Sequence, residues 1–462
     1  MELEYSKTEP AQEKVQVAVF GGGPAGVCAA IAAARCGAKT LLVEQYGACG
    51  GMATQGLVGP FMTCYDRSGQ HMVIHGLFEE IVDRMVEKGG AIHPSQVRSG
   101  TAFTSWITAG HDHCTPFEPE VLKRVLDEML LEADVKILYH TAFLEPCIAE
   151  GKITGARVYS KSGIEKIEAD VCIDCTGDGD VARGCGAAYE DGNEALGIRQ
   201  PATMFFRVGG VDAQKVEDDI QAHIGDFYRK DGVNYRSMYW HVAKARAEGD
   251  WTMDRVSIGL YRSVKPDEWA INTSRVMGVN AIDNRSLTAG EIEGRRQVEE
   301  IFHCLKKYVP GFENARLLCS GATLGIRESC HIHGRYELQT DDLLHAKVPA
   351  DSVFVASNSV DVHGRFGPKS NEYMTIQDGE YYGVPYRSLL PEGVGGLLIA
   401  GRCLSASSEA AGAVRVMPPV MAMGQAAGTA AALAVRTGCE PAQVDIGELQ
   451  RQLRADGVYL PQ

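Results

Sequence analysis

Apolar and polar positions near the start of the chain predict one strand–helix–strand unit. Val15–Phe20 is a short, β-branched apolar run that ends at glycines, which is typical of a buried parallel strand. Pro24–Arg35 is rich in alanine and is followed by Gly37, so a helix with a glycine stop is expected there. Thr40–Glu44 has the composition of a second strand. The unit spans about 30 residues, the length of a compact βαβ crossover.

Apolar runs further along the chain predict additional helices and strands. The middle, 201–370, shows no second strand–helix–strand pattern and is expected to be mixed α/β. The other elements expected are a helix over Glu118–Glu132, strands at Val135–Tyr139, Ile153–Tyr159, Ile164–Ile173 and Gly396–Ala400, and a long helix from near Pro418.

Gly21, Gly23 and Gly26 form a G-x-G-x-x-G motif between the first strand and the first helix. In this context the first glycine turns the chain, the second lets the backbone approach a pyrophosphate, and the third packs helix against strand. Gly23 is also expected to need a backbone conformation that valine resists. Glu44 ends the next strand, where a carboxylate bonds ribose hydroxyls. The motif predicts a bound ADP moiety and leaves FAD and NAD open.

The composition and charge of the chain limit which binding partners and which cellular compartment are expected. The 462 residues carry a net charge of −15, which argues against nucleic acid or an anionic membrane as partner. The apolar stretch Val420–Val435 is shorter than the roughly 20 residues of a membrane span. Residues 1–14 are polar, without a secretory or transit signal, and are expected to form a mobile tail. The 14 cysteines are therefore expected to be reduced thiols in the cytoplasm.

Three later motifs favour FAD. Tyr46–Gly56 is a glycine-rich loop, and Ala169–Asp180 is a strand that ends in a Thr-Gly-Asp turn. Leu397–Arg402 is followed by Met417–Gly428, which begins with two prolines. This order resembles the FAD-dependent oxidoreductases of the glutathione-reductase/fumarate-reductase superfamily.

A narrower resemblance rests on Leu324–Ser329, Asp361–His363 and Ala400–Pro418. These segments are similar to a bacterial family called FAD-dependent oxidoreductase, which is named for its cofactor. Members often carry histidine at the position of Ser408, and a second one near Ala411. That departure indicates chemistry or a substrate different from theirs.

The resemblance implies an α/β fold in which a Rossmann-like FAD-binding domain is discontinuous in sequence. Its three-layer, parallel-sheet architecture would be built from 15–200 and 371–440. A mixed α/β substrate domain, 201–370, would be inserted between these halves, and 441–462 would form a C-terminal segment.

The resemblance also implies which residues hold a non-covalent FAD. The helix from Pro418 would point its N-terminus at the flavin pyrimidine ring, although an ordinary buried helix explains its composition equally well. The Gly424-x-x-x-Gly428 pattern would let this helix pack close to the sheet. The expected cofactor residues are Gly21, Gly23, Pro24, Ala25, Gly26, Glu44, Gly51, Met52, Ala53, Thr54, Ala142, Thr176, Gly177, Asp178, Gly401, Arg402 and Met417.

Arg327, His363 and Arg415 are the candidate catalytic residues. Arginine forks clamp carboxylates or polarise carbonyls, and histidine serves as general acid or base near neutral pH. The alternatives are structural ion pairs, such as Arg327 with Glu328 or Glu409, a core histidine, and an apolar pocket. No metal is expected, because the His- and Cys-containing motifs lack complete ligand sets, and Cys172 and Cys175 fall on opposite faces of a strand.

These expectations combine into an FAD-dependent oxidoreductase that transfers hydride between a small organic substrate and flavin N5. A flavin oxidase or monooxygenase using O₂, and a flavoprotein subunit that relays electrons to partner proteins, are the alternatives. Beyond the small-molecule substrate, a second copy of the chain or a redox partner protein is left open.

Overall fold

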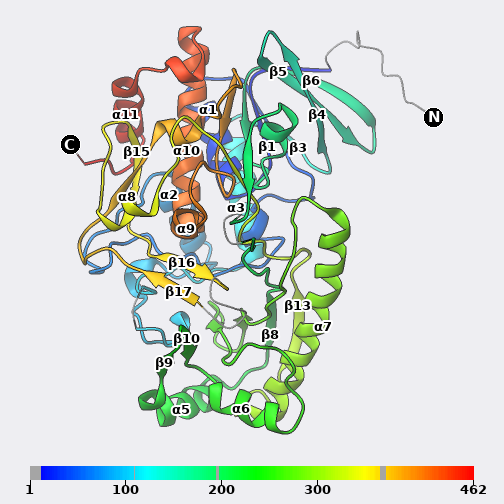
Figure 1. Ribbon diagram of the computed structural model, residues 1–462, viewed down its shortest axis with the longest axis vertical. Helices are drawn as coiled ribbons and strands as arrows, with labels where there is room; N and C mark the ends of the chain where they lie inside the picture. Colours follow the sequence, from blue (N-terminus) through cyan, green and yellow to red (C-terminus); the bar gives the residue numbers. More distant parts are fainter. Residues whose placement is uncertain (1–11, 109, 194–196, 365–370, 462) are drawn as a thin grey trace.

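The computed structural model describes residues 12–108, 110–193, 197–364 and 371–461. Its main sheet has the strand order β3-β2-β1-β6-β5-β4, with β19 also paired to β6 (Figure 1). Neighbours among β3, β2, β1, β6 and β19 run parallel, whereas β4, β5 and β6 form an antiparallel meander. The strands are β1 (Glu13–Phe20), β2 (Thr40–Val43), β3 (Lys136–Leu138), β4 (Ala142–Ala149), β5 (Lys152–Ser160), β6 (Gly163–Asp174) and β19 (Leu397–Ile399).

Strand β6 joins the two parts of this sheet. Its first half pairs antiparallel with β5, and its last residues, Cys172–Asp174, pair parallel with Leu397–Ile399. Side chains of β1 alternate between two cores, with Val17 and Val19 on one face and Ala18 and Phe20 on the other. The expected α/β fold with a parallel sheet buried on both faces is confirmed.

Two helices cross in direct backbone contact on the Val17 face of the sheet. They are α1 (Pro24–Arg35) and α10 (Met417–Thr437). A Cβ added to Gly424 would lie 2.0 Å from the Ala25 carbonyl oxygen, and one added to Gly428 would lie 2.0 Å from that of Ala29. The glycines thus bring α10 directly against α1, whereas the sequence analysis expected them to let this helix pack close to the sheet; α10 also contacts β1 and β6 of that sheet.

Residues 202–324 build a second hydrophobic core, together with Ala102 and Trp106. It contains a four-stranded antiparallel sheet of order β11-β12-β8-β13 and occupies the lower end of the view, beside α5, α6 and α7 (Figure 1). Most buried apolar residues from Leu338 onward pack instead into the core of α1 and α10, while Leu397, Ile399 and Cys403 pack on the other face of the main sheet. The expected domain boundary at residue 370, and 1–11 of the expected tail, lie outside the described residues.

The remaining elements are short, apart from α7. No helix in the described ranges is long and apolar enough to cross a membrane. The helices are α2 (Leu77–Glu87), α3 (Pro119–Glu132), α4 (Asp180–Gly184), α5 (Ala213–His223), α6 (Tyr239–Ala247), α7 (Asn284–Tyr308), α8 (Thr340–Leu344), α9 (Ser408–Val414) and α11 (Ile446–Ala455). The strands are β7 (Tyr189–Asp191), β8 (Phe206–Gly209), β9 (Tyr228–Lys230), β10 (Val233–Tyr235), β11 (Leu260–Arg262), β12 (Trp269–Ile271), β13 (Arg316–Ser320), β14 (Cys330–Ile332), β15 (Ser352–Ala356), β16 (Val360–His363), β17 (Asn371–Met374) and β18 (Tyr382–Pro385).

Candidate functional site

The glycine motif forms the turn between β1 and α1. Gly21 has φ +98°, and a Cβ there would lie 2.4 Å from the Cys175 carbonyl oxygen. A Cβ on Gly26 would lie 1.7 Å from the carbonyl oxygen of Gly21, so this glycine lets the first turn of α1 sit on the loop. Nothing lies within 4 Å of a Cβ built on Gly23, which leaves open space where the motif receives a pyrophosphate. Gly23 has φ −69°, which any residue adopts, so the expectation of a glycine-only conformation there is wrong.

Glu44, directly after strand β2, holds the glycine loop in place through hydrogen bonds. Its carboxylate accepts hydrogen bonds from the backbone N–H of Gly22 at 2.6 Å and of Tyr46 at 2.8 Å. Burial raises the pKa of Glu44, although these backbone donors oppose the shift. Each carboxylate oxygen keeps a second lone pair, which leaves Glu44 able to accept ribose hydroxyls as well.

A cavity of about 490 Å³ extends from this loop to the start of α10. Gly26, Ala53 and Thr54 do not line it: Gly26 serves helix packing, and the Thr54 hydroxyl donates to the Cys49 carbonyl. The other expected cofactor residues do line it, namely Gly21, Gly23, Pro24, Ala25, Glu44, Gly51, Met52, Ala142, Thr176, Gly177, Asp178, Gly401, Arg402 and Met417.

The Thr-Gly-Asp turn is held by Asp174, a residue that the sequence analysis did not single out. Asp174 is fully buried at the end of β6 and accepts from the hydroxyl and the N–H of Thr176 and from the N–H of Ala182. Asp178 pairs with Arg402 at 2.6 Å. This ion pair holds the two side chains in place in one wall of the cavity, and both residues line the cavity.

A second cavity, of about 220 Å³, adjoins the first. The five residues that line both cavities are Met52, Ile326, Arg327, Arg415 and Met417. Met417 is the first residue of α10, so the positive end of this helix dipole lies at the junction. His363 lines the second cavity, which thus brings together the three candidate catalytic residues of the sequence analysis.

Neither arginine at the junction forms an ion pair in the described part of the chain. Arg327 donates to the Pro201 carbonyl, and Arg415 donates to the side-chain oxygen of Gln200 at 3.3 Å and to the Asp361 carbonyl at 3.2 Å. Burial and the nearby guanidinium groups lower the pKa of Arg327 to about 9, and burial also lowers the pKa of Arg415. Two cationic groups that have Asp361 nearby but make no direct salt bridge in the described residues are well suited to bind an anion.

The alternative considered for Arg327, an ion pair with Glu328 or Glu409, does not occur among the ion pairs of the described residues. Glu328 is buried and binds Ser408, His331 and the N–H of Gln200. Ser408 lies outside the lining of both cavities. It therefore stabilises the segment behind Arg327 without facing the junction.

His363 and Asp361 extend from the same face of β16. His363 Nε2 lies 3.0 Å from Asp361 Oδ2, while Val362 packs into the core on the opposite face. Burial lowers the pKa of His363 to about 3, with Asp361 opposing the shift and Arg327 adding to it. The histidine is therefore neutral at physiological pH.

Sequence reasoning missed several other residues of the second cavity. His111 is buried there, and burial together with the charge of Arg236 lowers its pKa to about 3. Tyr373, from the strand paired with β16, lines the same space. His111 lies in a loop more than 200 positions before Arg327, and Tyr373 lies on another strand, β17, so neither residue carries a periodic signal that could have joined it to Arg327.

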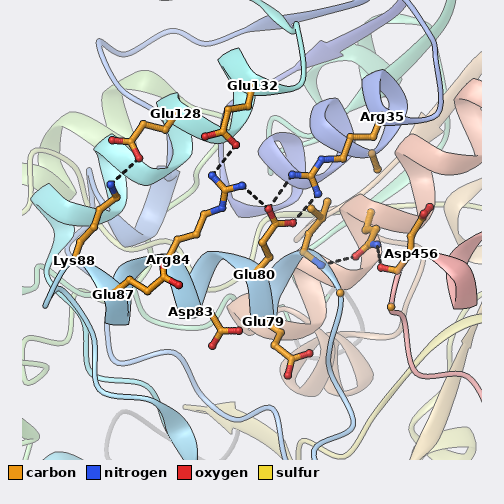
Figure 2. A pocket seen from close by; sticks show the side chains of 15 residues that line it. Arg35, Glu79, Glu80, Asp83, Arg84, Glu87, Lys88, Glu128, Glu132 and Asp456 are labelled. Atoms are coloured by element: carbon orange, nitrogen blue, oxygen red, sulfur yellow. Dashed lines mark hydrogen bonds and ion pairs between the residues drawn. The ribbon is translucent and has the colours of Figure 1, made fainter.

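A third recess, of about 740 Å³, lies elsewhere (Figure 2). It is lined by α1 at the end opposite the glycine loop, and by acidic side chains of α2 and α3. Glu80 bridges Arg35 at 2.6 Å and Arg84 at 2.8 Å, and Arg84 also binds Glu132 at 2.7 Å. These charges compensate one another and tie three helices together, so we assign no ligand to this recess.

The two neutral histidines predict a steep loss of stability in acid. The unfolded chain protonates histidine near pH 6.5, whereas the folded protein resists protonation of His111 and His363 down to about pH 3. The free energy of unfolding should therefore fall as the pH drops below about 6.5, with each histidine contributing up to about 1.4 kcal/mol per pH unit. Urea midpoints between pH 7 and 5 should fall less steeply in His111→Asn than in the wild type.

The exposed His303, 60% of whose side chain is accessible, provides the control. His303→Asn should keep the wild-type pH dependence. Parallel pH curves for His111→Asn and the wild type would contradict the assignment of a neutral buried imidazole.

Several solved structures are similar to this chain at low sequence identity. A geranylgeranyl bacteriochlorophyll reductase-like protein from Thermoplasma acidophilum is 15% identical, with 96% of this chain and 82% of that chain covered and a TM-score of 0.42. Flavin-dependent brominase Bmp2 is 11% identical, covering 96% and 83%, with a TM-score of 0.46. L-proline dehydrogenase from P. horikoshii is 12% identical, covering 96% and 99%, with a TM-score of 0.44. No curated protein matches the sequence.

A family model described as FAD dependent oxidoreductase matches residues 16–453. The match spans the glycine loop, the turn after β6, both cavities and α10. The expected cofactor, FAD, fits the long cavity, where Gly23 leaves room for a pyrophosphate and Glu44 offers a carboxylate to a ribose. The chain is an enzyme that uses FAD and belongs to the family of FAD-dependent oxidoreductases.

Proposed function

We propose that the enzyme transfers hydride between flavin N5 and a carbon of a small, oxygen-rich organic anion held in the second cavity. The observation that carries the proposal is the junction of the two cavities at Arg327 and Arg415. FAD supplies the two-electron acceptor or donor. The smaller cavity, of about 220 Å³, lies below the roughly 300–1,000 Å³ of drug-sized pockets, which favours a small substrate.

The charges around the second cavity support an anion. The protein as a whole is acidic, with a net charge of −15, yet Arg327, Arg415 and Arg67 line this space. Three aspartates line it too, but each already accepts a hydrogen bond: Asp66 from Ser68, Asp112 from the N–H of Ser99, and Asp361 from His363. Arg67 pairs with Asp378 at 3.2 Å, whereas the other two arginines remain available for a ligand. Guanidinium groups also stabilise negative charge that develops on a substrate oxygen during hydride transfer.

Binding of small carboxylates to the FAD-loaded protein tests the proposal. Succinate, propionate and their hydroxylated relatives should perturb the flavin absorption spectrum in a saturable way. Arg327→Met and Arg415→Met should each weaken that binding about 10- to 100-fold, the worth of a charge-assisted hydrogen bond, and leave the FAD content unchanged.

Arg35→Met, in the ion-paired recess, is the control and should bind carboxylates like the wild type. Unchanged affinity in both junction variants would refute the anion site. Loss of FAD from Arg415→Met would make this residue a cofactor ligand.

A separate measurement identifies which molecule accepts electrons from the reduced flavin. We expect photoreduced protein to be reoxidised slowly by air, as in a dehydrogenase or a reductase. Rapid reoxidation would instead favour the oxidase or monooxygenase reaction, and co-purification with an iron–sulfur protein would favour the relay subunit.

A further inference from the structure

The pairing of Asp361 with His363 fixes which imidazole nitrogen can accept a proton. Burial alone would raise the pKa of Asp361, but His363, Arg415 and Arg327 outweigh burial and hold it below its usual range. The ionised Oδ2 therefore takes the Nε2–H of His363 across 3.0 Å. The lone pair of this neutral imidazole then lies on Nδ1, which has no hydrogen-bond partner among the described residues.

Other lining residues of the same cavity also carry buried polar atoms that have no partner in the part of the chain that the structure describes. Asp361 Oδ1 and Asn358 Oδ1 are acceptors, and Arg415 Nε is a donor. Leaving such a group unpaired is unfavourable, so the ligand of this cavity is expected to satisfy them. With His363 Nδ1, the set calls for a ligand that has hydrogen-bond donors beside an anionic group. A carboxylic acid with a hydroxyl group close by has this composition.

We propose that the substrate is a small hydroxy acid, and that His363 Nδ1 removes the hydroxyl proton as the neighbouring carbon is oxidised. The inference rests on the proposed function and specifies its substrate class and direction. The O–H bond breaks, an N–H bond forms at Nδ1, and the C–H electron pair leaves with its hydrogen as the hydride that FAD accepts. A C=O bond forms, so the product is the corresponding keto acid.

The surroundings of His363 favour a hydroxyl group over an ammonium group. Arg327, Arg415 and Arg275 all act on the Asp361–His363 pair, and Tyr373 faces it from the neighbouring strand. Asp361 is the carboxylate nearest His363; Asp66 and Asp112 also line the cavity but accept hydrogen bonds from Ser68 and from the N–H of Ser99, and Asp254 acts on Arg275. An amino acid would bring a cation beside three guanidinium groups, whereas a neutral hydroxyl brings no charge.

Anaerobic titration of the FAD-loaded protein with matched pairs of acids tests the substrate class. The pairs are lactate with propionate and malate with succinate, with both enantiomers of each hydroxy acid. We expect at least one hydroxy acid to bleach the visible flavin band, and its deoxy partner to shift the band without bleaching it. We also expect the hydroxy acid to bind about tenfold more tightly, because it satisfies acceptors that the deoxy acid leaves unpaired.

The outcomes separate this inference from the proposed function. Binding of carboxylates without bleaching by any hydroxy acid would overturn the hydroxy-acid inference and leave the anion site standing. Bleaching by alanine or aspartate, but by neither hydroxy acid, would overturn it in favour of an amine substrate. If none of the acids bound, both proposals would fail.

His363→Gln tests the role of the imidazole. The variant should keep its FAD and bind the deoxy acid within about threefold of wild type, while bleaching slows about 100- to 10,000-fold, the usual worth of a general base. His303→Gln should bleach at the wild-type rate. In the wild type the bleaching rate should stay level from pH 8 to pH 5, because the imidazole remains neutral. A His363→Gln variant that bleached as fast as wild type would overturn the assignment of the base.

Discussion

Replacing Gly23 with valine is expected to leave the protein folded and to lower its FAD content at least tenfold. A Cβ at this position meets no atom within 4 Å, and φ −69° with ψ −176° is open to any residue. The first carbon of the side chain therefore causes no clash in the protein itself. The isopropyl group does occupy the part of the 490 Å³ cavity that a pyrophosphate needs.

The readout is the flavin that acid precipitation releases from gel-filtered protein, since a non-covalent cofactor is expected to enter the supernatant. Gly21→Val is the contrasting variant, because its Cβ would lie 2.4 Å from a backbone oxygen at φ +98°, and we expect it to misfold. Glu44→Ala should fold and lose part of its FAD. Full FAD occupancy in folded Gly23→Val would refute the assignment of the loop.

The second large effect is expected at the crossing of α1 and α10. Gly424→Val should lower the free energy of unfolding by more than about 3 kcal/mol, beyond the usual cost of overpacking, because the clash involves backbone atoms. The added Cβ would lie 2.0 Å from the Ala25 carbonyl oxygen, and that oxygen moves only if the helices separate. Since α1 begins at the phosphate loop, FAD affinity should fall as well.

Thermal midpoints with and without added FAD measure this effect. Gly225→Ala is the matched control, because nothing lies within 4 Å of its Cβ, and it should change the free energy of unfolding by less than about 0.5 kcal/mol. Equal midpoints for Gly424→Val and the wild type would show that the two helices can separate without cost.

Local signals predicted the elements that bind the dinucleotide. The α1 boundaries Pro24 and Arg35 were predicted to the residue, because a proline start and an alanine-rich run act within the helix itself. β1 begins at Glu13, before the expected Val15, since pairing with β6 continues into polar positions. Strand β4 was missed because its residues are half-exposed or exposed, so no apolar alternation marks it.

The long helix in the middle of the chain, α7, was predictable from the sequence and was overlooked. Helix α7 buries Val298, Ile301, Leu305 and Tyr308, which recur at three- and four-residue spacing. Its other faces are strongly polar, and this polarity obscured the pattern.

The second cavity was predictable only in part. Arg327, His363 and Arg415 were expected from motifs, and the structure lines one cavity with all three. Asp361 belongs to the same motif as His363. Its role, however, depends on strand β16, which places both side chains on one face of the strand. His111 and Tyr373 join them through tertiary packing, for which a single sequence carries no local signal.

The contact between α1 and α10 has a consequence for how the enzyme is made. About 380 residues separate the two helices, and at about 5–20 residues per second a ribosome needs about 20 to 75 seconds to add them. Throughout that time the alanine-rich surface of α1 lacks the helix that covers it in the finished protein. Cofactor loading must therefore follow the emergence of Met417, and a nascent chain stalled before that residue has a dinucleotide loop but no complete place for FAD.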